Sequence, residues 1–165
     1  VLGAAHERAA WGLGVVVLAI AWHLAVSARP SREALLVLGV AALGSGLEAL
    51  HLATGWITYA TGPTTWPPLW LVALWALFAT SLNVSLRWLR GHWLLAAMLG
   101  AVCGPFVFAS GARLGAVTLH QPGWSLALLA VLWALALPAM LAWSRRFDGI
   151  AALAPLQENA HARLA

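Results

Sequence analysis

Residues 124–144 read WSLALLAVLWALALPAMLAWS, an apolar run without a single charged side chain. A helix crosses about 30 Å of hydrocarbon with about 20 such residues, so this stretch predicts a transmembrane helix. Four other stretches have the same character and comparable length. The sequence therefore predicts an all-α fold, a polytopic transmembrane helix bundle with five spans as given, at about 9–28, 33–54, 67–89, 92–112 and 124–144.

Composition supports a chain whose solvent is the bilayer. Hydrophobic residues make up 62% of the sequence and charged residues 8%, whereas soluble domains carry about 25% charged residues. All nine basic residues are Arg, and they stand singly or in pairs at the ends of apolar segments. This pattern excludes a nucleic-acid partner, because no basic stripe with interleaved aromatics is present. We expect one bundle domain, 1–146, and a cytoplasmic or interfacial tail, 147–165.

The arginines also predict an orientation. Cytoplasmic loops of membrane proteins carry an excess of Arg and Lys. One side of the predicted bundle has only Arg113 and Arg8, and Glu7 offsets the latter. We therefore place the Val1 side outside and the C-terminus in the cytoplasm. The cytoplasmic side then holds six arginines: Arg29, Arg32, Arg87, Arg90, Arg145 and Arg146.

An outer polar layer is predicted from residues within the spans, where polar groups are costly and are functional candidates. Glu48 lies about 22 Å above the cytoplasmic start of its helix, His51 is one turn further out, and Arg113 ends the fourth span on that side. An ion pair between Glu48 and Arg113 is one reading, and a neutral Glu48 is another. The Glu-x-x-His spacing occurs once, without further carboxylates, so we assign no metal. Glu48 is also a candidate catalytic acid that would protonate a polyene double bond.

An inner polar layer is predicted about 15 Å away from Glu48 in depth. These side chains would bind a ligand head group or form hydrogen bonds between helices. The histidine of this layer has two readings. It is an interior residue whose hydrogen bonds are satisfied within the bundle, or it is an axial ligand of haem or chlorophyll. The layer contains His23, Ser81, Asn83, Ser85 and Arg87.

Glycine, proline and tryptophan predict how the helices pack. Gly100 and Gly104 form a small-residue face that lets two helices approach closely. Pro105 and Pro138 are expected to kink the fourth and fifth spans, since each lacks a backbone donor. Bent helices can leave a cavity. Three tryptophans lie too deep for an interfacial belt and need packing or hydrogen-bond partners: Trp22, Trp75 and Trp133.

Two runs resemble a bacterial family of small inner-membrane proteins that is catalogued as domain of unknown function 2878. The first is PPLWLVALWALFATSLN at 67–83, followed by SLRWL at 85–89. The second extends from Gly100 through 104–105 to GARLGA at 111–116. The resemblance covers most of 9–143. It implies localisation in the bacterial inner membrane.

The same resemblance implies a further hydrophobic helix upstream of Val1, which would give six spans and two cytoplasmic termini. The family tends to carry Asp where this chain has Glu48. It brings no established activity, although its members are often encoded near enzymes that modify fatty acids. That association implies work linked to lipids.

Three functions remain open from the sequence. The chain is expected to bind or handle a lipid or another hydrophobic small molecule, and a bound lipid, quinone or pigment would suit it. Alternatively it is a non-catalytic subunit of a larger membrane complex, with other membrane chains as partners besides the lipids. The third reading is an enzyme acting on lipids or isoprenoids through Glu48. No nucleotide loop or hydrolase motif is present, and the balance leans away from catalysis.

Overall fold

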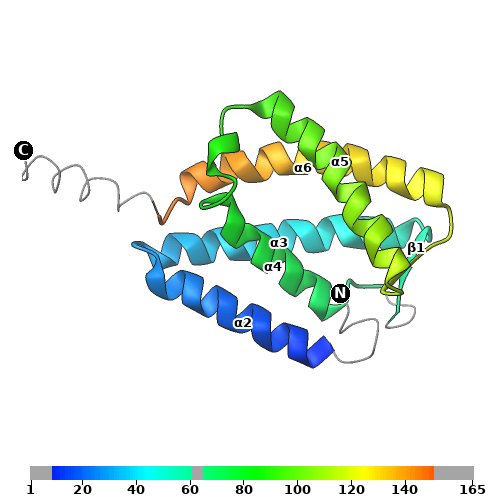
Figure 1. Ribbon diagram of the computed structural model, residues 1–165, viewed down its shortest axis with the longest axis horizontal. Coiled ribbons are helices and arrows are strands. Elements are labelled where there is room, and N and C mark those ends of the chain that lie inside the picture. The colour runs from blue at the N-terminus through cyan, green and yellow to red at the C-terminus, as the bar shows by residue number, and fades with distance from the viewer. Residues whose placement is uncertain (1–8, 61–64, 151–165) are drawn as a thin grey trace, which may run out of the picture.

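The computed structural model describes residues 9–60 and 65–150, and it confirms the predicted all-α bundle. Figure 1 shows long helices lying side by side. The last described residues, which follow α6, lie at one end of the bundle. The elements in chain order are α2 (Ala9–Val26), α3 (Pro30–Ala53), β1 (Ile57–Tyr59), α4 (Leu69–Leu82), the short 3-10 helix η1 (Arg87–Leu89), α5 (Trp93–Arg113), β2 (Val117–Leu119) and α6 (Pro122–Arg146).

The helices pack in two groups. In the first group α4 packs on both α3 and α2, and in the second α5 packs along α6. Contacts of α6 with α3 and α4 join the groups, and so does the pairing of β1 with β2. Helices α4 and α5 thus lie mainly against other helices and not against each other. The candidate site lies between them.

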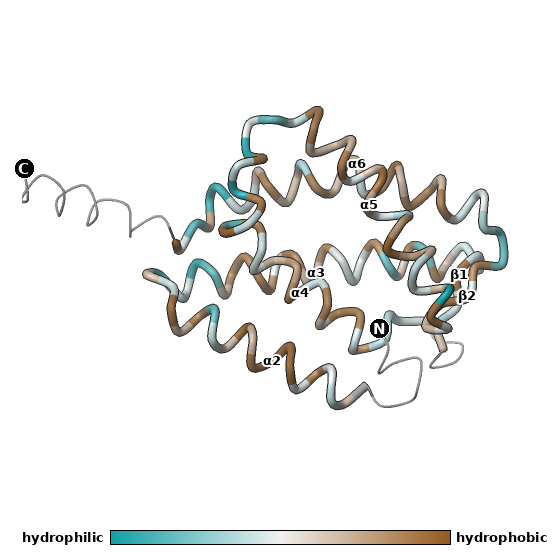
Figure 2. The backbone as a smooth tube through the Cα atoms, in the orientation of Figure 1, coloured by the Kyte–Doolittle hydropathy of each residue, from teal (hydrophilic) through white to brown (hydrophobic). Residues whose placement is uncertain are grey.

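Three helices are long and apolar enough to cross a membrane, namely α3, α5 and α6. The helices α2 and α4 are apolar but shorter. Figure 2 shows hydrophobic residues along most of the helices and hydrophilic residues mainly near the helix ends. This is the distribution that a bilayer imposes, because polar groups are expensive in hydrocarbon.

Helix α4 ends earlier than the predicted span 67–89. Its last residue is Leu82, and Asn83 caps it. The hydroxyl of Ser81 turns back to the carbonyl of Phe78, while the Ser81 carbonyl accepts from the backbone of Val84 and Leu86. These local bonds compete with continued helix. The chain then passes through η1 before α5 begins.

A short two-stranded antiparallel sheet, β1–β2, lies at the opposite end of the bundle, in segments outside the predicted spans. Strands β1 and β2 are antiparallel, and Thr58 pairs with Thr118. Gly115 adopts a φ of 77°, a left-handed conformation that glycine tolerates, in the turn between α5 and β2. The β1–β2 sheet holds Tyr59 over the interior of the bundle, where it is buried.

Two tryptophans and two glycines join the helix groups at the centre. The rings of Trp75 and Trp133 stack with centroids 4.8 Å apart and an interplanar angle of 18°. A Cβ at Gly44 would collide with the Trp75 ring, and one at Gly104 would collide with Trp133. These glycines therefore provide room for the indoles, as the predicted small-residue face at Gly104 indicates.

Candidate functional site

Glu48 is the centre of a buried cluster on α3. Its side chain is 1% exposed. The hydroxyl of Tyr59 donates to Oε2 at 2.7 Å, and the indole N–H of Trp75 donates to Oε1 at 3.2 Å. Each carboxyl oxygen thus has a donor, which offsets the cost of placing the group inside the bundle.

Tyr59 reaches Glu48 because β1 lies across the end of α3. Burial, with a contribution from the neighbouring carboxyl group, raises the pKa of Tyr59. The phenol therefore stays protonated and acts as the donor. Its ring packs edge-on against Trp70 at a centroid distance of 5.9 Å, so the wall of the cluster is aromatic.

His51 lies beside Glu48 but is not satisfied. The ring is 2% exposed, and Nδ1 is 3.7 Å from Glu48 Oε2, beyond hydrogen-bond distance. Neither ring nitrogen has a hydrogen bond of good geometry among the described residues, although the backbone of Leu47, one helical turn earlier, is close to the ring. The imidazole packs against the ring of Phe108 on α5, with centroids 6.0 Å apart. An unsatisfied buried polar group costs about 1–3 kcal/mol, so a native structure that keeps one calls for an explanation.

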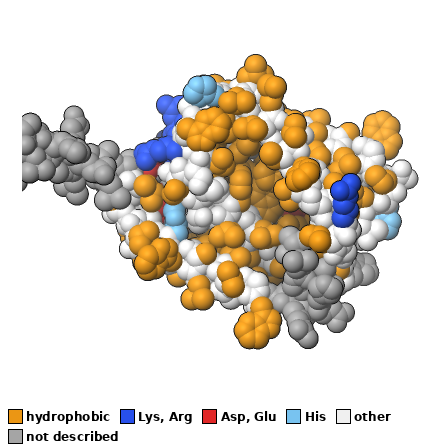
Figure 3. Space-filling model, viewed as in Figure 1, with side chains coloured by type: hydrophobic (Ala, Val, Ile, Leu, Met, Phe, Trp, Pro, Cys, Tyr) orange, Lys and Arg blue, Asp and Glu red, His pale blue; other side chains and the backbone are white. Residues whose placement is uncertain are grey.

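An apolar cavity of about 40 Å³ lies next to this cluster. The indole N–H of Trp70, a buried residue of the cavity wall, also lacks a partner within the described part of the chain. Figure 3 shows that this face of the molecule is hollowed over α4 and α5, with mostly hydrophobic side chains around the hollow. The cavity is lined by Tyr59, Trp70, Leu71, Leu74, Val107, Phe108, Gly111, Ala116 and Val117.

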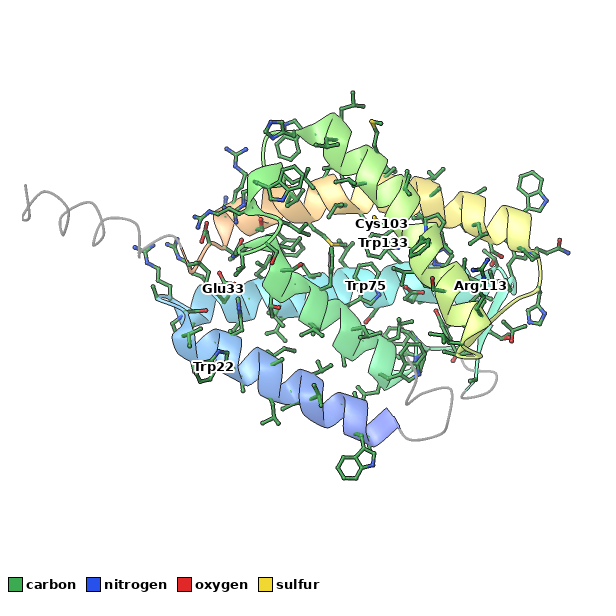
Figure 4. All side chains as sticks on the ribbon, in the orientation of Figure 1. Trp22, Glu33, Trp75, Cys103, Arg113 and Trp133 are labelled. Carbon is green, nitrogen blue, oxygen red and sulfur yellow. The ribbon has the colours of Figure 1, made fainter. Side chains whose placement is uncertain are left out.

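Arg113 is not the partner of Glu48, contrary to the ion-pair reading of the sequence. It is exposed at the end of α5 and makes no ion pair with a carboxylate among the described residues. Figure 4 shows Arg113 near the β1–β2 end of the bundle, away from the labelled Trp75. Tyr59 and Trp75, which are neutral donors, bind Glu48 in place of the arginine, because β1 brings the phenol within reach of the carboxyl group.

The second polar cluster, at the opposite end of α3, centres on Glu33. This side chain is fully buried and accepts from three directions. His23 Nε2 lies 2.9 Å from Oε2, while the Asn83 amide and the Gly149 backbone N–H donate to Oε1 at 2.6 and 2.7 Å. Glu33 lies 15 positions before Glu48, about 22 Å along the helix, so the two clusters are separate sites.

Asn83 and Asp148 extend this inner cluster to the arginines. Arg90 donates to Asn83 Oδ1 and, at 2.7 Å, to Asp148 Oδ2. Arg87 donates to the same Asp148 oxygen at 2.7 Å. The residues after α6, predicted to begin a tail, therefore pack into the end of the bundle as far as Gly149. Residues 151–165 of that tail lie outside the described part of the chain.

The other predicted site residues have local roles or none. The side chain of Ser81 bonds only within its own helix, and Ser85 is exposed. Pro105 and Pro138 lie inside continuous helices, so the kinks stay predictions. Among the described residues, no three side chains of His, Cys, Asp or Glu gather as a metal site would need.

Sequence reasoning missed three members of the clusters. Glu33 had the appearance of a helix-start carboxylate, Arg90 that of a turn residue and Asp148 that of a tail residue. One signal was available in the sequence. Asn83 and His23 need hydrogen-bond acceptors inside the bundle, and the chain has few acidic residues that could supply them. Trp22, expected to find a partner, is instead 72% exposed, and Figure 4 shows it pointing away from the bundle.

Comparison with known families agrees with the two runs quoted above. A family model described as "Protein of unknown function (DUF2878)" matches residues 1–139. The chain belongs to this family. The matched DUF2878 region contains Glu48 with its donors Tyr59 and Trp75, and it also contains Glu33, His23 and Asn83. It ends before Asp148. No curated protein and no solved structure matches the chain.

Proposed function

We propose that this DUF2878 chain is an integral membrane protein that binds a hydrophobic small molecule in the hollow between α4 and α5. The observation that carries the proposal is the apolar cavity beside the Glu48 cluster. Binding sites for small molecules combine apolar and aromatic walls with a few placed polar groups. The walls here come from α4, α5 and the β1–β2 sheet, and the wall residue Tyr59 donates a hydrogen bond to Glu48 of α3.

The size of the cavity limits what enters it. A volume of about 40 Å³ exceeds the roughly 10–15 Å³ that one water needs, but it holds only one end of a lipid-sized molecule. The remainder of such a molecule would lie in the hollow that Figure 3 shows over α4 and α5. The ligand is therefore long and narrow, with its end inserted between Trp70 and Phe108.

The exposed charges support an orientation in the membrane. Five exposed arginines lie at the end of the bundle that contains Glu33, whereas Arg113 is the exposed arginine described near the β1–β2 sheet. By the positive-inside rule the Glu33 end is cytoplasmic and the β1–β2 sheet faces the periplasm. The proposed site then opens toward the outer half of the bilayer. The five are Arg29, Arg32, Arg87, Arg145 and Arg146.

A matched pair of glycine variants tests the site. Gly111 lines the cavity, and a Cβ there would make only an ordinary contact, 3.6 Å from Val117. Gly111→Leu should fill the cavity without breaking the backbone. Gly46 is an exposed helical glycine with open space around it, so Gly46→Leu adds the same side chain elsewhere.

The assay is photo-crosslinking with a hexadecyl probe that carries a diazirine at its end, followed by peptide mapping. We expect labelled peptides from α4 and α5 in the wild-type chain and in Gly46→Leu, and their loss in Gly111→Leu. Equal labelling in all three proteins would contradict the proposal. The subunit and enzyme readings of the sequence stay predictions, because no observation in the structure favours either.

A further inference from the structure

We propose that the end of the bundle that contains Glu33 binds an anionic phospholipid with two phosphate groups in its head. This surface shares no residue with the site between α4 and α5, and the proposal goes beyond that site. Four exposed arginines would hold the head group, one pair at the start of α3 and one pair in the last turn of α6. They are Arg29, Arg32, Arg145 and Arg146.

Backbone hydrogen bonds bring the two arginine pairs to the same end of the bundle. The N–H of Arg29 donates to the carbonyl oxygen of Gly149 at 3.0 Å. Gly149, three positions after Arg146, also donates its own N–H to Glu33 at 2.7 Å. The chain that leaves α6 is therefore fixed against the start of α3. Figure 3 shows arginine side chains at this end of the molecule on the face that it draws.

The acidic side chains of the described residues leave these four arginines without a counter-charge. Glu33 and Glu48 are buried, at 0% and 1% exposed. Asp148, the remaining described acid, accepts from both Arg87 and Arg90 at 2.7 Å. The four arginines of the proposed surface make no ion pair with a carboxylate in the part of the chain that the structure describes. Their positive charge is therefore available to an anionic partner.

Two exposed tryptophans favour a lipid as that partner. Trp22 near the end of α2 is 72% exposed, and Trp143 near the end of α6 is 37% exposed. Indole rings prefer the level of the lipid head groups, where an apolar ring and one N–H donor are both accommodated. Both rings lie on helices just before the turns that carry the arginines. The guanidinium groups are thus placed where a phospholipid has its phosphates.

Two pairs of arginines match two linked phosphates better than a single one. A guanidinium group binds phosphate oxygens through paired, charge-assisted hydrogen bonds. A head group with one phosphate would occupy one pair and leave the other uncompensated. When the second phosphate belongs to the same molecule, its binding is intramolecular and gains from a high effective concentration. A lipid of the cardiolipin type has this chemistry.

The test measures lipid binding to the full chain in neutral detergent micelles by native mass spectrometry. Cardiolipin and phosphatidylglycerol are titrated at equal phosphate concentration, with phosphatidylcholine as the uncharged reference and inorganic pyrophosphate as the soluble diphosphate. We expect cardiolipin to bind about tenfold more tightly per phosphate than phosphatidylglycerol. Equal binding of these two lipids per phosphate, or equally tight binding of pyrophosphate, would overturn the proposal.

Arginine variants locate the binding surface. Arg29→Gln and Arg145→Gln each remove one exposed charge from one pair, and each should weaken cardiolipin binding about threefold. The double variant should weaken it about tenfold, close to the level of phosphatidylglycerol. Arg113→Gln removes the same charge at the other end of the bundle and should leave cardiolipin binding unchanged. An equal loss in Arg113→Gln, or no loss in the double variant, would overturn the proposal.

Discussion

Glu33 is predicted to hold its end of the bundle together, and replacing it with leucine tests this. The carboxylate accepts from His23, Asn83 and Gly149 with no exposure to solvent. Hydrogen bonds to charged groups contribute about 1.5–3 kcal/mol each, and removing one partner of a buried network costs about 3–5 kcal/mol. Glu33→Leu leaves the backbone N–H of Gly149 buried without its acceptor, and the Asn83 amide keeps only the Phe147 carbonyl. We therefore expect the free energy of unfolding to fall by about 3–5 kcal/mol.

Reversible unfolding in mixed micelles with increasing denaturing detergent measures this change. Two variants serve as controls. Glu33→Gln keeps an oxygen acceptor of the same length for Asn83 and Gly149, and it should lose less than half as much stability. Arg32→Gln alters the charge at the adjacent exposed position and should shift stability by less than about 0.5 kcal/mol. A Glu33→Leu protein as stable as Arg32→Gln would refute the reasoning.

Two other predictions concern packing and orientation. Gly44→Ala places a Cβ into the ring of Trp75, and overpacking of this kind should cost about 1–3 kcal/mol in the same unfolding assay. For orientation, single cysteines at the exposed positions Ser31 and Thr118, in a chain with Cys103→Ala, should react differently with a membrane-impermeant maleimide. In intact cells we expect Thr118→Cys to be labelled and Ser31→Cys to be protected.

Each of these has its own control. Gly12 has nothing within 4 Å of a built Cβ, so Gly12→Ala should leave stability unchanged or raise it by about 0.5–1 kcal/mol. A loss in Gly12→Ala equal to that in Gly44→Ala would count against the close contact with Trp75. Permeabilised cells should label both cysteines, and the reverse pattern in intact cells would invert the proposed orientation.

The helices were predictable because hydrophobicity over about 20 residues is a strong local signal. All five described α-helices begin within three residues of the start of their predicted spans, and α2 begins at the predicted residue. The separation of Glu48 from Asn83 followed from the helical rise alone. The end of α4 at Leu82 was not predictable because it depends on local bonds that compete with the helix. The β1–β2 sheet was not predictable because it pairs segments that are far apart in the sequence.

The site was predictable as a list of candidates but not as a set of contacts. Glu48 and His51 were identified from their depth in an apolar segment, whereas their partners depend on the packing of distant elements. Tyr59 comes from a strand that the sequence did not reveal, and Trp75 reaches Glu48 because Gly44 leaves room for its ring. Arg113 was proposed as the ion-pair partner of Glu48 from its charge and depth, and the fold leaves it exposed.

The binding claim is tested most directly by native mass spectrometry of the full chain, gently extracted from its own membrane. The account predicts a co-purifying hydrophobic molecule at one per chain in the wild type, and its absence from Gly111→Leu, in which the cavity is filled. A wild-type chain that carries no small molecule, or a Gly111→Leu chain that carries the same one at the same ratio, would contradict it.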